Sequence, residues 1–184
     1  MTNPAPPPLK LFISYSHVDE RYVNELRKEL KLMKDVGLIR PWWDRALKAG
    51  EKWKQRILRE LNEADVIVCQ LSRDFLASDF CVLTELDTAI RRKKAGKVEL
   101  IAYVLRHCSW QQVTRLAQFQ VLPKDAKPLR KWADRDEYWK EIAEGIRSVL
   151  GEFQRVRSVS ASGGVRGKRT RSRAPHPSRS RANR

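Results

Sequence analysis

Cysteine, histidine and glycine are scarce in this chain of 184 residues, and their scarcity excludes several kinds of site. The three cysteines and three histidines are scattered, without a CxxC pair or an HExxH motif, so we expect neither a disulfide framework nor a bound metal. This cysteine usage fits a reducing, cytoplasmic location. No glycine follows the first predicted strand, and no GxGxxG or P-loop sequence occurs. Rossmann dehydrogenases and P-loop enzymes, which hold phosphate at such a turn, are therefore excluded.

Long hydrophobic runs are missing as well. No apolar run approaches the roughly 20 residues that a membrane helix needs, so we expect no transmembrane segment. The first residues, MTNPAPPPLK, lack the basic flank and the apolar stretch of a secretory signal. We interpret residues 1–8 as a proline-rich leader.

Acidic side chains stop at Glu152, although the whole chain contains 22 of them beside 38 basic ones. Residues 155–184 contain nine arginines and one lysine, which is 10 of the 16 net positive charges. A segment of Arg, Ser, Gly and Pro cannot bury a core, so we expect residues 154–184 to be a disordered basic tail. Such a tail attracts polyanions without sequence preference; the alternative is a solvated tail that keeps the chain soluble.

Hydrophobic periodicity predicts alternating strands and helices over residues 9–153. Apolar, β-branched runs predict strands at 9–15, 38–42, 65–71, 98–105 and 119–122. Helical spacing predicts helices at 19–33, 52–64, 74–95 (with a candidate break near Ser78) and 134–150, with Gly37, Gly96 and Gly151 at the ends of three segments. This order implies a mostly parallel α/β sheet with helices on both faces, and Pro41 favours an edge position for the second strand.

Polar side chains follow the first three predicted strands, at the sheet edge where parallel sheets bind ligands. In strand order they are Ser14, Ser16 and His17; Asp44 and Arg45; and Ser72 and Arg73. The third strand ends without the aspartate that a response-regulator receiver needs, so that class is excluded. On the third helix, Glu85 adjoins an apolar face, which places it at the core boundary or in a cleft; a solvated glutamate is the alternative.

Three segments, in this order and at this spacing, resemble the TIR (Toll/interleukin-1 receptor) domain family of the bacterial type. LFISYSHVDE at 11–20 resembles its first box, PWWDRALKAGEKW at 41–53 its BB loop, and FLASDFCVLTEL at 75–86 the helix with its catalytic glutamate. The resemblance implies a flavodoxin-like fold with a five-stranded parallel sheet, in agreement with the periodicity. Many bacterial members cleave NAD+ between nicotinamide and ribose, and the ADP-ribose or cyclic product acts as a signal, often in antiphage defence. Other members only assemble with further TIR domains.

The resemblance places the catalytic role on Glu85. Nicotinamide leaves a pyridinium cation as a neutral molecule, so no general acid is needed, and one carboxylate can stabilise the oxocarbenium-like ribose. We therefore expect an NAD+ nucleosidase with NAD+ as substrate and no cofactor. The alternative is a non-catalytic module that binds other TIR domains, or further copies of itself, through residues 43–52.

Further side chains are expected to bind the substrate around Glu85. Many NAD-cleaving relatives have a tryptophan four residues before the glutamate, where this chain has Cys81. One helical turn separates Cys81 from Glu85, so we expect the thiol to line the site. Tryptophan rings can stack on nicotinamide or adenine, with core packing as the alternative. The substrate-binding candidates are Ser14, Ser16, His17, Trp43, Asp44, Arg45, Trp53, Phe80 and Cys81.

Overall fold

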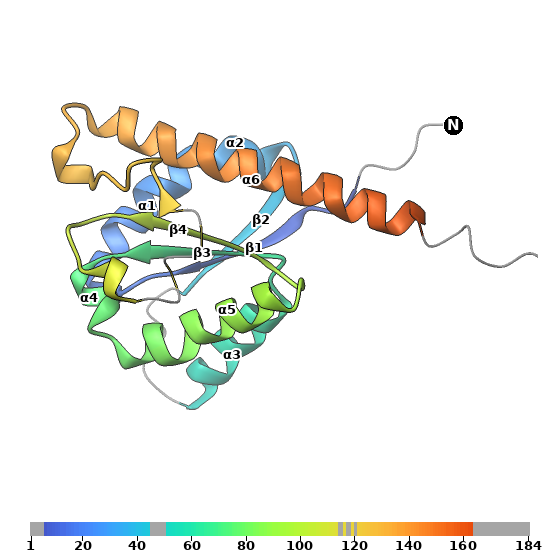
Figure 1. Ribbon diagram of the computed structural model, residues 1–184, viewed down its shortest axis with the longest axis horizontal. Helices are drawn as coiled ribbons and strands as arrows, with labels where there is room; N and C mark the ends of the chain where they lie inside the picture. Colours follow the sequence, from blue (N-terminus) through green and yellow to red (C-terminus); the bar gives the residue numbers. More distant parts are fainter. Residues whose placement is uncertain (1–5, 45–50, 114–115, 117–118, 120, 164–184) are drawn as a thin grey trace, which may run out of the picture.

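Five parallel strands form one sheet in the order β2-β1-β3-β4-β5 in the computed structural model, which describes residues 6–44, 51–113, 116, 119 and 121–163 (Figure 1). The strands are β1 (Leu9–Ser14), β2 (Ile39–Trp43), β3 (Val66–Leu71), β4 (Glu99–Val104) and β5 (Val121–Leu122). This is the predicted flavodoxin-like sheet. The edge position of β2, which Pro41 indicated, is also confirmed.

Helices cover both faces of the sheet, as predicted (Figure 1). One face carries α1 (Glu20–Glu29), α2 (Lys31–Asp35) and α6 (Arg135–Gly163), and the other carries α3 (Glu51–Glu63) and α5 (Asp87–Lys94). Side chains of a strand alternate between the faces, so Leu11 and Ile13 of β1 enter the first core and Phe12 enters the second. This alternation decides which side chains meet at the ends of the strands.

Two predicted helices are divided into shorter pieces. Residues 17–35 form a 3₁₀ turn, η1 (His17–Asp19), followed by α1 and α2, which meet at Leu30. The third predicted helix is interrupted near Ser78, as the sequence indicated. It consists of α4 (Arg73–Leu76), a π-helix, η2 (Phe80–Leu86), and α5.

We predicted that a glycine ends three of the segments, and two of the three glycines do so. Gly37 and Gly96 adopt left-handed φ angles of 72° and 67°, and the preceding helices stop there. Gly151 is not among the positive-φ residues, and α6 continues through it to Gly163. The prediction that this helix ends at Leu150 is therefore wrong.

The extension of α6 is attached to the domain by packing and by charge. Phe153 packs against the core, and the Arg157 guanidinium lies 2.5 Å from an Asp65 carboxylate oxygen, next to the start of β3. Residues 154–163, which we expected to be disordered, are helical for this reason. The remainder of the predicted tail, 164–184, and residues 1–5 of the leader lie outside the described residues.

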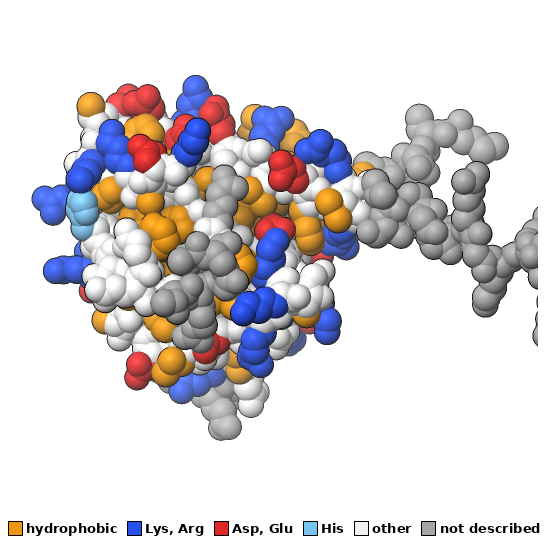
Figure 2. Space-filling view, in the orientation of Figure 1, with side chains coloured by type: hydrophobic (Ala, Val, Ile, Leu, Met, Phe, Trp, Pro, Cys, Tyr) orange, Lys and Arg blue, Asp and Glu red, His pale blue; other side chains and the backbone are white. Residues whose placement is uncertain are grey.

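Basic and acidic side chains are interspersed over the face shown in Figure 2, and the Lys and Arg residues do not gather into one stripe there. A strongly basic stripe is the usual footprint of a nucleic-acid surface, so this face gives no indication of one. Within the described ranges, no helix combines the length and the apolar character needed to cross a membrane.

Candidate active site

Glu85 lies at the carboxyl end of β1, as the sequence predicted. The hydroxyl of Ser14, the last residue of β1, donates a hydrogen bond of 2.6 Å to Glu85 Oε2. Only 5% of Glu85 is exposed. The residue belongs to the π-helix, a form that appears mostly as short bulges, frequently at functional sites. A buried carboxylate is thus oriented by a strand 71 residues away in the sequence.

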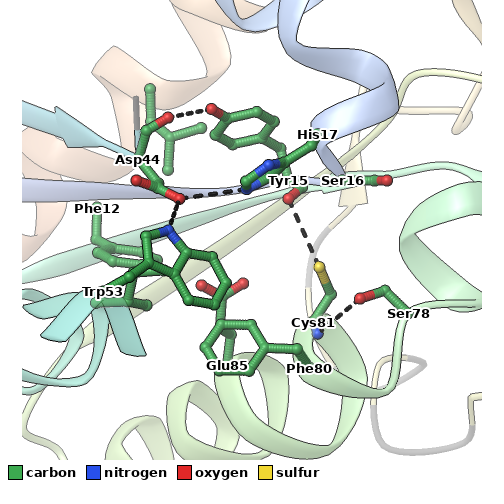
Figure 3. A pocket seen from close by; sticks show the side chains of 12 residues that line it. Phe12, Tyr15, Ser16, His17, Asp44, Trp53, Ser78, Phe80, Cys81 and Glu85 are labelled. Atoms are coloured by element: carbon green, nitrogen blue, oxygen red, sulfur yellow. Dashed lines mark hydrogen bonds and ion pairs between the residues drawn. The ribbon is translucent and has the colours of Figure 1, made fainter. Parts of the chain in front are cut away.

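A cavity of about 250 Å³ opens beside the Glu85 carboxylate, among side chains from β1, η1, α3 and the π-helix (Figure 3). Aromatic rings provide much of its wall, and two carboxylates, three hydroxyls, an imidazole and a thiol are among its polar groups. The lining residues are Phe12, Ile13, Tyr15, Ser16, His17, Asp44, Trp53, Ile57, Ser78, Phe80, Cys81 and Glu85.

The aromatic wall consists of rings in mutual contact. The ring centroids of Trp53 and Phe80 are 5.2 Å apart, with 33° between the planes. His17 lies nearly parallel to Tyr15 at 5.8 Å and edge-on to Trp53 at 6.0 Å. The face of an aromatic ring attracts a cation, so this wall suits a flat cationic ligand.

Asp44 supplies the second carboxylate of the pocket. It follows β2, is 5% exposed, and its Oδ2 accepts a hydrogen bond of 2.5 Å from Trp53 Nε1. The same oxygen lies 3.2 Å from His17 Nε2, and the backbone carbonyl of Asp44 accepts a hydrogen bond from the Tyr15 hydroxyl. Three side chains therefore fix this residue (Figure 3).

The pKa of the Glu85 carboxyl is raised to about 7, chiefly because burial disfavours the charged form. The hydrogen bond from Ser14 lowers this pKa, the nearby Asp44 carboxylate raises it, and a hydrogen bond from Cys81 lowers it. A carboxyl group that titrates near neutral pH in a cleft is a candidate for chemistry.

Cys81 lines the pocket, as predicted, but does not offer a nucleophile. Its thiol donates to the backbone carbonyl of Tyr15 at 3.5 Å. Burial, followed by the Glu85 carboxylate, raises the pKa of the thiol to about 12. The reactive form of cysteine is the thiolate, which is not populated near neutral pH at such a pKa.

Replacing Ser14 with alanine is expected to raise the pKa of Glu85 by about one unit, because a hydrogen bond to a charged group contributes roughly 1.5–3 kcal/mol. Titration of the Glu85 carboxyl carbon by NMR measures this shift. Ser16→Ala is the matched control, since Ser16 lines the same pocket and, of the two serines, Ser14 is the one hydrogen-bonded to Glu85. Equal pKa values in the two variants would contradict the assigned contact.

The structure places most of the predicted residues together. Ser14 touches Glu85, and the pocket wall contains Ser16, His17, Asp44, Trp53, Phe80 and Cys81. Arg45 lies outside the described residues. Ser72 does not line the pocket; it caps α4 through the Phe75 backbone N–H and donates to Asp19.

Trp43 is the exception: we predicted it beside the ligand, but it does not line this pocket. The strand β2 extends one residue further than predicted and pairs Trp43 with Ile13. The ring therefore points to the opposite face of the sheet, where the Arg27 guanidinium lies 3.6 Å from its centroid. Trp42, its neighbour, stacks on Phe12 at the face that carries Glu85.

Tyr15 and Ser78 are pocket residues that the sequence analysis did not select. Tyr15 stands between the selected Ser14 and Ser16, and the same strand-end argument applies to it. Ser78 marked only a helix break, yet its hydroxyl accepts the Cys81 backbone N–H at 3.3 Å. Among the described residues, no group of three or more His, Cys, Asp or Glu side chains could hold a metal ion.

Comparison with known proteins identifies the family to which this architecture belongs. A model of the TIR domain family matches residues 11–142. The uncharacterized protein y4lF of Sinorhizobium fredii is 35% identical over 149 residues, which is 81% of this chain and 46% of y4lF. This chain therefore spans less than half the length of that relative.

The TIR domains of the activated Roq1 resistosome, which directly recognizes the pathogen effector XopQ, align with 77% of this chain and 84% of theirs, at 18% identity and a TM-score of 0.45. The family model alone covers most of the sheet, the π-helix and the start of α6. The chain therefore belongs to the TIR domain family.

Proposed function

We propose that this chain is an NAD+ nucleosidase that cleaves the bond between nicotinamide and ribose to give ADP-ribose or a cyclic isomer. The observation that carries the proposal is the buried Glu85 carboxylate, held by Ser14 beside an aromatic-walled pocket. Nicotinamide leaves with the electron pair of the broken bond, which neutralises its pyridinium ring, and positive charge develops on the ribose. A fixed, buried carboxylate stabilises that charge. NAD+ is the substrate, and the chemistry requires no cofactor.

The size of the pocket favours one end of the dinucleotide. Its volume of about 250 Å³ is below the roughly 300–1,000 Å³ of most small-molecule sites, so it suits nicotinamide and ribose, with the rest of NAD+ outside. Trp53 and Phe80 both line it, and an aromatic ring attracts a cation such as the nicotinamide ring. Phe80 thereby supplies an aromatic surface although Cys81 stands where many NAD-cleaving relatives have tryptophan.

Incubation of the purified chain with NAD+ tests the proposal, with nicotinamide measured by chromatography. Release in proportion to protein is expected. Active sites of this family often need two subunits, so the assay is repeated at rising protein concentration and with a crowding agent. A protein that assembles under these conditions and releases no nicotinamide would favour the alternative, a TIR–TIR interaction module. Of the loop proposed for that role, 43–52, residues 45–50 lie outside the described residues.

The proposed product suggests a role for the domain in the cell. ADP-ribose or a cyclic isomer, made in the cytoplasm on assembly with other TIR domains, would serve signal transduction or antiphage defence. The basic tail, 164–184, would bring the domain to a polyanion. Nicotinamide release is the first step of this sequence and is therefore the step to measure first.

A further inference from the structure

His17 is held in one orientation although its side chain is 50% exposed. Its Nε2 lies 3.2 Å from Asp44 Oδ2, and its ring contacts Tyr15 on a face and Trp53 at an edge. Fixing an exposed side chain costs rotamer entropy, and these contacts offset that cost. The contacts place an imidazole at the mouth of the pocket that contains Glu85 (Figure 3).

Asp44 determines which nitrogen of this imidazole can accept a proton. Nε2 is the ring nitrogen that faces Asp44, and a carboxylate only accepts hydrogen bonds, so this contact favours the neutral tautomer with its hydrogen on Nε2. The free electron pair is then on Nδ1, which has no hydrogen-bond partner within the described ranges. Asp44 keeps its own orientation through Trp53 Nε1 and the Tyr15 hydroxyl. A fixed carboxylate, an imidazole with a defined tautomer and an open Nδ1 form a general base with its positioning residue.

We propose that His17 is the general base that activates the attacking water, with Asp44 as its positioning residue, so that this chain hydrolyses NAD+ to ADP-ribose. The inference rests on the proposed function and adds the product to it. Glu85 is 5% exposed and already accepts the Ser14 hydrogen bond, so it is placed to stabilise charge on the ribose. His17 lines the same pocket and is half exposed, so its ring is accessible to water.

The step balances without any further reactant. The water oxygen forms a bond to the anomeric carbon of the ribose, and the bond from that carbon to the nicotinamide nitrogen breaks. Its electron pair neutralises the pyridinium, while the water proton passes to Nδ1 of His17 and from there to solvent. The products are nicotinamide, ADP-ribose and one proton. A nucleophile that has no proton to lose does not need this base.

Added 3-acetylpyridine provides that nucleophile, because its ring nitrogen attacks the anomeric carbon without losing a proton. The rates of ADP-ribose formation and of base exchange are measured together in the wild type and in His17→Gln. Glutamine can still donate to Asp44 but is not a base. We expect hydrolysis to fall about 100-fold while exchange changes less than about threefold.

His107→Gln is the matched control, because His107 is exposed and does not line this pocket; both of its rates should equal those of the wild type. Asp44→Asn is the second variant, and it should lower the ratio of hydrolysis to exchange about tenfold by loosening His17. An equal loss of both rates in His17→Gln, or no loss, overturns the role of His17 while nicotinamide release still supports the proposed function. If the wild type forms neither product, the proposed function and this role fail together.

Discussion

Replacing Glu85 with glutamine is expected to slow nicotinamide release by about 100- to 1,000-fold, the range found when one electrostatic stabiliser of a transition state is removed. The amide has nearly the same shape, and its oxygen can still accept the Ser14 hydrogen bond. What the variant loses is the negative charge that stabilises the ribose as positive charge develops. The loss should therefore lie mainly in kcat, with KM changed much less.

Glu99→Gln is the control for this substitution, since Glu99 is a partly buried glutamate that lies outside the pocket and is bound to Lys93 at 2.5 Å. Its nicotinamide release should equal that of the wild type. Glu85→Asp keeps the charge but is one methylene shorter, which withdraws it from Ser14, so an intermediate rate is expected. A Glu85→Gln rate close to the wild type would show that this carboxylate is not the catalyst.

The sheet and the location of Glu85 were predictable because both follow from local patterns. The run DVIVCQL reads as a strand covered on both faces, and every residue of β3 is buried. Ser14 ends one apolar run, and Glu85 adjoins the apolar face of the third predicted helix. Parallel connections bring the carboxyl ends of strands to one edge, so the two could be expected to meet.

The contacts that complete the site were not predictable, because each depends on exact geometry between distant segments. Because β2 includes Trp43, this ring lies on the face of the sheet opposite to Glu85. Residue propensities do not predict the end of a strand to within one residue. The π-helix that turns Glu85 inward has no sequence signature of its own. The pairing of His17 with Asp44 joins η1 to the residue after β2, and the pairing of Arg157 with Asp65 stabilises α6 beyond Gly151.

The stability of the folded protein should fall as pH rises from about 4.5 to about 7, and Glu85→Gln should remove that fall. The folded state holds the Glu85 proton more tightly than the unfolded chain, because its pKa is raised from 4.5 to about 7. The stabilisation that Glu85 contributes is fully present below its pKa in the unfolded chain, 4.5, and is lost as pH rises through its pKa in the folded protein, about 7. At about 1.4 kcal/mol per pKa unit, the contribution amounts to about 3 kcal/mol.

Urea unfolding of the wild type and Glu85→Gln at acidic and mildly alkaline pH measures this contribution. Between acidic and alkaline pH, the wild type should lose about 3 kcal/mol more unfolding free energy than Glu85→Gln does. This corresponds to a difference of about 6–12 °C in the change of Tm. Other titrating groups contribute to both proteins and cancel in this double difference. Parallel stability profiles would show that burial does not raise the pKa of Glu85.

The two Glu85→Gln results together separate a catalytic carboxylate from a structural one. A structural carboxylate contributes to stability through its contacts, so its neutral replacement lowers stability and affects activity only through unfolding. Glu85 has one strong hydrogen bond, from Ser14, and a second carboxylate nearby, which does not offset the cost of burying its charge. If Glu85→Gln is more stable than the wild type at alkaline pH and yet inactive, the charge of Glu85 serves catalysis and lowers stability.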